Sequence, residues 1–177
     1  MRFQISRQVL AEDWSLSFSD IEFANTKPAV SRLGVAFQLK FFSANGYFAT
    51  HGTELPEEAI SYLADQLAVR SDLGGYDFVG RSARRHSSEI LRYLGFRRLK
   101  QKERAVLVNW IRQELCPRGG TVAVMLDAVF LWCRDRQIFA SSTKAMERLV
   151  RAERQRFMDV FVDRVADRLW PHRKVSS

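Results

Sequence analysis

Hydrophobic residues recur along the chain at the spacing of helices that bury one side. Over residues 57–69, apolar side chains from Ile60 to Leu67 fall at positions i, i+3, i+4 and i+7, which is one face of an α-helix. Residues 28–43 are apolar almost throughout and begin with a proline, so a buried helix is predicted there, ending at Asn45-Gly46. Both patterns favour helices over strands.

The same reasoning covers the rest of the chain. The stretch before Ser17 is expected to be irregular, Ser17 to cap a helix, and further helices to follow at about 100–115, 121–132 and 144–170. The last of these is expected to be one long helix or two joined near 152–154. Its predicted inward-facing residues are Leu149, Phe157, Val160, Phe161, Val165 and Leu169.

These elements predict an all-α protein of about eight helices in one or two packed bundles. An N-terminal helical subdomain is expected over residues 1–98 and a second helical subdomain over residues 99–177. The composition agrees, because the chain is 46% hydrophobic and 27% charged, with only 9 Gly and 4 Pro in 177 residues.

Charge is divided unevenly along the chain. Residues 1–75 carry 6 Lys and Arg against 9 Asp and Glu, a net of −3, whereas residues 76–177 carry 22 against 11, a net of +11; together they give the overall +8. Such an asymmetry indicates a polyanionic partner, either nucleic acid or an anionic membrane surface. Most of the basic residues are Arg, whose planar fork of donors suits phosphates and guanine edges.

The densest basic segment, residues 81–94, has two faces on a helical wheel. One face is formed by Arg81, Arg84, Arg85, Ser88 and Arg92, and the opposite face by Ala83, Ile90 and Leu94. His86 and Tyr93 lie at the border, Gly95 is expected to cap the C-terminus, and Gly80 is expected to leave the N-terminus open to a phosphate. A helix docked by its apolar side and presenting Arg and Ser is suited to the DNA major groove.

The candidate DNA-binding residues extend beyond this helix into a basic segment. The helix at 57–69, joined to the basic helix by a linker that contains glycine, predicts a helix-turn-helix-like element with a longer turn. The full set of candidates is Arg81, Ser82, Arg84, Arg85, Ser88, Arg92, Arg97, Arg98, Lys100, Lys102 and Arg104.

Other chemistry finds little support in the sequence. No metalloprotease, nucleophile-elbow or P-loop pattern occurs, and the four tyrosines lack the Arg and His spacing of a recombinase site, so no catalytic residue is predicted. Cys116 and Cys133 are expected to be reduced and partly buried, and neither a metal site nor a cofactor is expected. No apolar run reaches a membrane span, and the first seven residues lack the apolar core of a signal peptide.

Several motifs, in order along residues 14–170, resemble the N-terminal domain of transposases of the Tn-three family, the class II unit transposons. The resemblance departs at Val35 and at Ser43–Asn45, so no DNA role is assigned to that turn. The matching motifs are Arg32–Leu39, Tyr47-Phe48, Leu63–Leu67, Tyr76-Asp77, Gly80–His86, Ile90, Leu94–Arg97, Trp132–Arg136 and Glu147–Leu149.

The resemblance implies sequence-specific binding of double-stranded DNA at the terminal inverted repeats of a transposon. In that family a DDE-type catalytic domain lies far downstream, so this chain is expected to bind transposon ends without cutting or joining them. Other transposase protomers are possible partners, no membrane is expected, and the expected location is the bacterial cytoplasm, at the nucleoid when bound. The alternative is a basic helical module that binds an acidic protein, or nucleic acid without specificity. The basic residues of its C-terminal helix would be Arg148, Arg151, Arg154 and Arg156.

Overall fold

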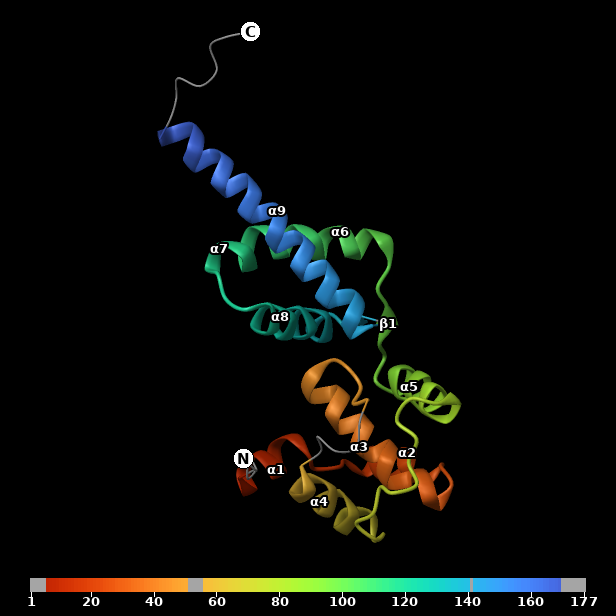
Figure 1. Cartoon of the computed structure of the whole chain (residues 1–177). Helices are drawn as coiled ribbons and strands as arrows, with labels where there is room; N and C mark the ends of the chain where they lie inside the picture. The colour runs from red at the N-terminus through yellow and green to blue at the C-terminus, as the bar shows by residue number, and fades with distance from the viewer. Residues whose placement is uncertain (1–5, 51–55, 141, 170–177) are drawn as a thin grey trace. The chain divides into compact units, whose positions relative to one another are not determined.

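The computed structural model describes residues 6–50, 56–140 and 142–169, and these are overwhelmingly helical (Figure 1). Eight α-helices in these residues span seven residues or more, and the only strands described there are two residues long. The all-α prediction is confirmed. The helices are α1 (Arg7–Asp13), α2 (Phe18–Asn25), α3 (Ala29–Asn45), α4 (Glu57–Leu67), α5 (Arg81–Tyr93), α6 (Gln101–Trp110), α8 (Val122–Asp135) and α9 (Thr143–Leu169).

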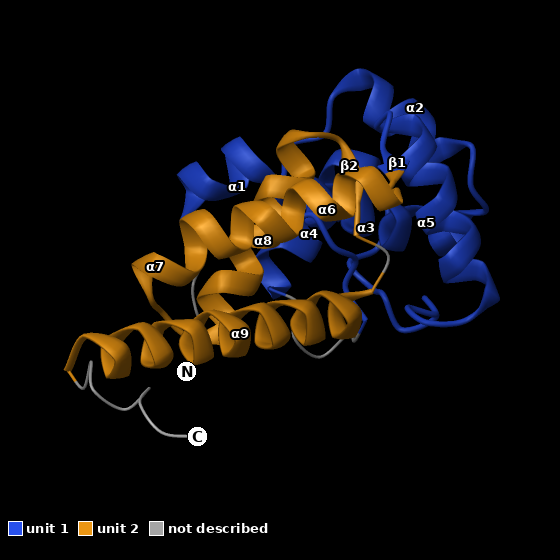
Figure 2. Ribbon diagram, turned by 90° about the horizontal axis from the view of Figure 1, so that it is seen from above, with its two compact units in different colours: residues 1–97 blue, residues 98–177 orange. Residues whose placement is uncertain are grey.

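The chain divides into two compact units, Met1–Arg97 and Arg98–Ser177 (Figure 2). The boundary between the units lies between Arg97 and Arg98. It falls within β1 (Arg97–Arg98), which pairs with β2 (Ile138–Phe139) in a two-stranded sheet. Beside this pair, the Leu99 N–H donates to the carbonyl of Phe139 at 3.2 Å.

Polar caps set where the helices begin. The Ser17 hydroxyl accepts from the Asp20 N–H at 3.1 Å and the Asp20 carboxylate accepts from the Ser17 N–H at 3.0 Å, a reciprocal cap that starts α2. The Ser6 hydroxyl likewise accepts from the Val9 N–H and starts α1. The expectation of an irregular start is therefore wrong: α1 is a short helix that Ser6 caps.

Helix α3 is the centre of unit 1. Eight of its residues are buried, Phe37 and Phe42 completely, and it ends at Gly46, whose φ of 76° closes the helix in the left-handed region. Its Gln38 is also buried, with its amide bonded to both the N–H (3.0 Å) and the carbonyl (2.8 Å) of Ala49. The buried helix predicted over residues 28–43 is confirmed.

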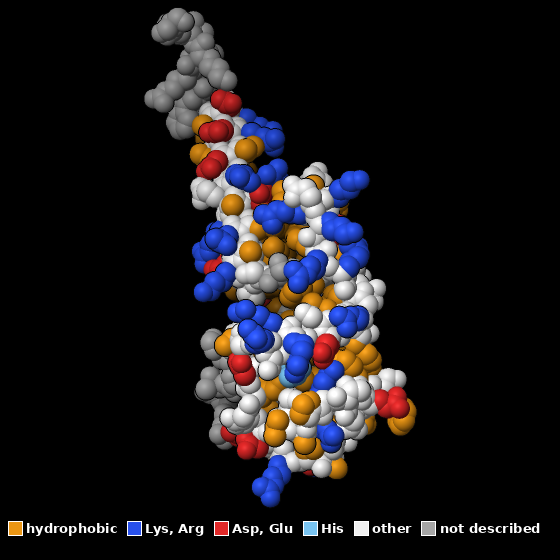
Figure 3. Space-filling model, turned by 90° about the vertical axis from the view of Figure 1, so that its right-hand side faces the viewer, with side chains coloured by type: hydrophobic (Ala, Val, Ile, Leu, Met, Phe, Trp, Pro, Cys, Tyr) orange, Lys and Arg blue, Asp and Glu red, His pale blue; other side chains and the backbone are white. Residues whose placement is uncertain are grey.

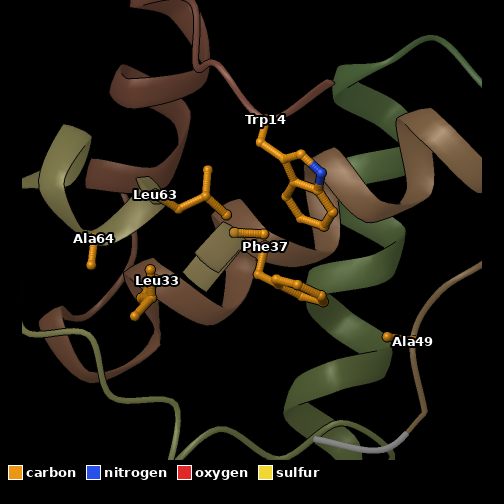
Figure 4. Packing of buried hydrophobic residues seen from close by; sticks show 7 residues of the cluster. Trp14, Leu33, Phe37, Ala49, Leu63 and Ala64 are labelled. Carbon is orange, nitrogen blue, oxygen red and sulfur yellow. The ribbon is translucent and has the colours of Figure 1, made fainter. Parts of the chain in front are cut away.

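One side of α3 carries the main hydrophobic core of unit 1 (Figure 4). Trp14, at the end of α1, lies against Phe37 with 5.2 Å between ring centroids. Leu63 of α4 and Leu33, one turn before Phe37 on α3, belong to the same cluster. The core is thus built from three helices, and α3 contributes to it with only one of its faces.

A second side of α3 is approached closely by an aromatic ring. A Cβ placed on Gly34 would lie 2.1 Å from Cδ2 of Tyr76, well inside any real contact distance. The absence of a side chain at residue 34 therefore lets the Tyr76 ring lie directly against the backbone of α3. Tyr76 in turn packs against α5, so this glycine helps to position the basic helix.

Unit 2 is built on a helix that is longer than its sequence predicts. A break was expected at residues 116–120, but α6 continues through a wide π turn (η2, Ile111–Leu115) and a last turn (α7, Cys116–Arg118). The Cys116 N–H bonds to the carbonyl of Ile111 five residues earlier, and the helix ends only at Gly119, with φ 71°. Pro117 lies in the last turn of this continuous helix, which ends two residues later.

The apolar residues of α9 are divided between a buried and an exposed half. Met146, Leu149 and Val150 are buried against the rest of unit 2, and α9 is a single helix. Leu149 therefore faces inward as predicted and Phe157 is half-buried. The same prediction is wrong for Val160, Phe161, Val165 and Leu169, which are 38–64% exposed, because α9 extends beyond the helices that cover its first half.

We expect Gly34→Ala to destabilise the protein, although alanine is intrinsically the better helix former by about 1 kcal/mol. The added methyl group would displace the Tyr76 ring, and overpacking of this kind costs about 1–3 kcal/mol. Urea unfolding should therefore give a net decrease in the free energy of unfolding of about 1 kcal/mol.

The matched control is the same substitution in a Tyr76→Ala background, where the ring is absent. There Gly34→Ala should be neutral or stabilising. An equal effect of Gly34→Ala in both backgrounds would show that the close approach of the ring does not limit residue 34.

Candidate nucleic-acid interface

Helix α5 is held by the small apolar side that its wheel predicted. Ile90 is completely buried and clusters with Val35 and Leu39 of α3, and Ala83 is buried on the same side of α5, nearer its start. Leu94 packs at the edge of the same cluster. The division of α5 into an apolar and a polar face is confirmed, and α3 is the element against which it docks.

The end of α5 is fixed by its glycine. The Phe96 N–H donates to the carbonyl of Leu91 at 2.8 Å and the Gly95 N–H to that of Arg92 at 3.2 Å, while Gly95 has a φ of 72°. This pair of bonds is the Schellman motif, which needs a left-handed residue at the position that Gly95 occupies. The predicted cap is confirmed, and the chain turns away there toward β1.

His86 does not lie at the border of α5 as predicted, because its ring is buried against Tyr76. The two rings are stacked with centroids 5.7 Å apart, and the Tyr76 hydroxyl lies 3.2 Å from Nδ1 of His86. Nε2 is buried and has no partner among the described residues. Burial, with the Arg85 cation as a second cause, lowers the pKa of His86, so the ring is held neutral.

Polar contacts fasten the two flanks of α5 to the segments around α2. Glu89 accepts from Nζ of Lys27 at 2.6 Å, and this bond lowers the pKa of Glu89. Near the end of the helix the Tyr93 ring stacks on Phe23 at 4.5 Å, and its hydroxyl donates to Asp20 at 2.8 Å. The acidic residue of α5 is therefore already paired with a lysine on a neighbouring segment.

The opposite face of α5 presents its arginines to solvent. Arg81, Arg84, Arg85 and Arg92 are all exposed, and the one ion pair that they form with the described residues is a loose one of 4.0 Å between Arg85 and Glu89. Arg81 and Arg92 make no hydrogen bond or ion pair with the described part of the chain. These guanidinium groups are thus available to an external anion.

The two candidate serines of the same helix, Ser82 and Ser88, are exposed. Ser88 donates to the carbonyl of Arg84 at 2.9 Å, within its own helix, which leaves its oxygen able to accept. Ser82 is exposed in the first turn. Ser88 therefore lies among the arginines as the wheel predicted.

The first turn of α5 has no side-chain cap, as expected, but a carboxylate lies directly before it. Asp77 accepts from the N–H groups of Val79 (3.0 Å) and Gly80 (2.7 Å), and these bonds hold its pKa below the ordinary value. A Cβ on residue 80 would lie 1.7 Å from this carboxylate, so the glycine leaves room for Asp77. An ionised carboxylate there repels a phosphate at that end of the helix.

The predicted helix-turn-helix-like element consists of α4 and α5, but the segment between them is not what orients α5. The connection between α4 and α5 runs over residues 68–80, and both helices pack against α3. Within it Ala68 is left-handed, with φ 52°. Helix α5 is therefore oriented by a buried third helix, and the linker does not orient it as a tight turn would.

The remaining candidate residues lie beyond α5 and are all exposed. Arg97 and Arg98 form β1, whereas Lys100 precedes α6 and Lys102 and Arg104 lie within it. All of these except Arg97 belong to unit 2, so the eleven candidates are shared between two units. In the upper half of Figure 3, which shows unit 2, Lys and Arg side chains gather around exposed hydrophobic atoms.

The candidate set missed a group of charged residues in unit 2. A cleft of about 460 Å³ is lined by Arg104, Arg112, Arg148 and Arg156. Arg104 is a DNA-binding candidate, whereas Arg148 and Arg156 were named only for the alternative of a basic module that docks on an acidic partner. The signal was present in the spacing, because 104 and 112, like 148 and 156, are eight residues apart and so lie on one side of a helix. The bond of Glu153 to Arg156 is an i,i+3 pair that spacing can suggest, whereas its bond to Arg112 on another helix could not be predicted from spacing.

Neither cysteine shows the environment of a reactive thiol. Cys116 and Cys133 are free and buried, and burial raises the pKa of Cys133 to about 11. No group of three or more His, Cys, Asp or Glu side chains in the described residues is placed to hold a metal ion. Among the same residues, none of the helices has the length and apolar character needed to cross a membrane.

The sequence matches a family model over nearly all of this structure. Residues 1–152 match the family described as Domain of unknown function (DUF4158). The chain belongs to the DUF4158 family. All eleven candidate residues fall inside this DUF4158 match, which ends within α9. None of the curated proteins matches the chain.

The depressed pKa of His86 predicts a pH-dependent stability. Above about pH 6.5 the imidazole is neutral in both folded and unfolded chains, and its contribution to stability is fully present. Below that pH the unfolded chain takes up the proton first, so the free energy of unfolding should fall. The slope from this one group is at most about 1.4 kcal/mol per pH unit.

We expect His86→Phe, which keeps a ring against Tyr76, to flatten the dependence between pH 7 and pH 5 in urea unfolding. Tyr76→Phe is the control, because it keeps both the stack and the titrating imidazole and should therefore retain the slope. An unchanged slope in His86→Phe would mean that His86 is not the group responsible.

Proposed function

We propose that this chain is a double-stranded DNA-binding module that recognises the terminal inverted repeats of a transposon, as part of a transposase of the Tn-three family. The observation that carries the proposal is the exposed arginine face of α5, anchored from behind by Ile90 on α3. The chain is proposed to bind DNA ends and not to catalyse their cleavage or joining.

The chemistry of this face suits both parts of DNA recognition. An arginine can bond the N7 and O6 of guanine with two parallel hydrogen bonds, which specifies a base, or bond a phosphate, which positions the helix. Arg85 and Arg92 lie on the side of α5 opposite its buried edge and are the proposed base readers. Lys100 and Lys102, at the start of α6, are proposed to bind phosphates.

The restraint of α5 supports this assignment as much as its charge does. The ring of Tyr93, the ion pair of Glu89 with Lys27 and the buried His86 fix the rotation of the helix about its axis. A reading helix needs such rigidity, because base-specific bonds depend on the direction in which each side chain leaves the helix. An ordinary basic surface would not need it.

The transposon target comes from the resemblance of the motifs, in order along residues 14–170, to the N-terminal domain of Tn-three transposases. The family description itself names no function. The competing proposal is a basic module that binds an acidic protein, or nucleic acid without specificity. The two differ in one measurable property, which is discrimination between DNA sequences.

A gel-shift titration over a series of salt concentrations separates the two proposals. The probes are a duplex carrying the end repeat of a Tn-three-type element and a scrambled duplex of equal length and composition. Preferential binding of the end repeat, retained as salt rises, supports recognition of transposon ends. Equal and weak binding to both duplexes would refute it and favour the non-specific module.

We expect Arg85→Ala and Arg92→Ala each to lower the ratio of end-repeat to scrambled affinity by roughly tenfold, the size of one bidentate hydrogen-bonded pair with a base. Lys100→Ala and Lys102→Ala should weaken both duplexes alike and flatten the log–log salt slope by roughly 0.9 for each phosphate that is no longer bound.

Arg70→Ala, which removes an exposed charge of unit 1 outside the candidate set, is the matched control and should change neither quantity appreciably. Identical behaviour of all four test variants would contradict the division into base readers and phosphate binders.

A further inference from the structure

We propose that the arginine-lined cleft of unit 2 is a binding site for a phosphate group. The cleft lies between α6, with its π-helical continuation, and the first half of α9, and has a volume of about 460 Å³. The proposed function makes no use of its lining residues other than Arg104. Unlike an ordinary basic surface, this site contains a buried glutamate that holds two of its arginines in place.

Two opposite walls of the cleft, one on α6–η2 and one on α9, carry the same arrangement of side chains. On one side Arg104, Val108 and Arg112 follow one another at intervals of four residues, and on the other Arg148, Ala152 and Arg156 do the same. Residues four apart lie above one another on a helix, so each wall carries two arginines separated by a small apolar residue. The four arginines therefore line the same space from two sides.

A buried carboxylate organises two of these arginines. Glu153 is only 2% exposed; it accepts from Nε of Arg112 and, at 2.5 Å, from a terminal nitrogen of Arg156. The arginine side chains are 48% and 63% exposed, so their remaining N–H groups still reach solvent. Glu153 thus holds one arginine from each wall in place, and its charge is compensated while each arginine uses only one of its nitrogens.

The other two arginines supply the uncompensated charge. Arg104 and Arg148 are exposed and make no hydrogen bond or ion pair with the rest of the described chain. Four arginines against one glutamate leave the cleft with a net charge of +3. Guanidinium groups bond phosphate oxygens in pairs, and this excess of charge favours a doubly charged anion over chloride or a carboxylate.

The phosphate group could come from a DNA backbone or from a free anion, and the same chemistry binds both. The test therefore uses inorganic phosphate and a scrambled duplex as separate probes of the full chain. Phosphate binding is followed through the Nε–Hε NMR signals of the arginines, with chloride added to matched ionic strength as the reference titration. The variants Arg104→Gln and Arg148→Gln remove one charge each from exposed positions and should leave the fold intact.

The matched control is Arg151→Gln on the same helix. Arg151 is exposed and paired with Glu147 at 2.7 Å, and it does not line the cleft. We expect saturable phosphate binding by the unmodified chain, weakened about tenfold by each cleft variant and unchanged by Arg151→Gln.

The duplex probe identifies the source of the phosphate. A parallel decrease of duplex affinity in the cleft variants, with a salt slope lower by roughly 0.9, assigns the site to a DNA backbone phosphate. Weaker phosphate binding with unchanged duplex affinity assigns it to a free anion. The proposal is overturned if the cleft variants bind both probes as the unmodified chain does, or if Arg151→Gln weakens binding as much as they do.

This outcome is independent of sequence recognition by α5. The phosphate titration needs no DNA, and the scrambled duplex carries no end repeat. A chain that fails to discriminate DNA sequences can still show a phosphate site in unit 2, and a chain without that site can still recognise transposon ends.

Discussion

The burial of α3 is the constraint on which unit 1 depends. A helix that is apolar on nearly all sides must be covered all round, and α3 is covered by different partners on different faces. Phe37 meets Trp14 and Leu63 on one face, whereas Val35 and Leu39 meet Ile90 of α5 on another. The same helix therefore both forms the main core and fixes the position of the basic helix.

Helix α5 shows how a strongly polar helix is held by few contacts. Only Ala83, His86 and Ile90 are buried, so its own hydrophobic area is small, and polar contacts at its flanks supplement it. His86 fits this site because burial keeps the imidazole neutral, so no charge has to be buried. In this way almost the whole cationic surface of α5 is left outside the core.

Unit 2 uses charge differently. Two of its arginines, Arg112 and Arg156, bond Glu153, a carboxylate that is buried between two helices. A buried carboxylate with one partner removed is strongly unfavourable, so the pairing restrains α6–η2 and α9 to one arrangement around the cleft. The arginines of α5 are exposed and available to an external anion. In the cleft, by contrast, Arg112 and Arg156 are already bonded to Glu153.

Local signals in the sequence were enough to determine the helices and many of their ends. The reciprocal cap at Ser17, the left-handed Gly46 and Gly95, and the two faces of α5 all follow from residue types at fixed spacings, because these interactions join neighbours along the chain. The sequence alone determined these features and the all-α class.

Tertiary structure decided which helical faces are covered. Periodicity marks Phe161 and Leu169 as apolar but cannot tell that α9 extends past its neighbours, and it places His86 at a border that Tyr76 closes. It also cannot show that Asp77 bonds the N–H groups just before α5 or that Glu153 bonds Arg112 on another helix. These contacts link residues far apart in the chain or depend on the path of a loop, and only the packing of whole helices brings them together.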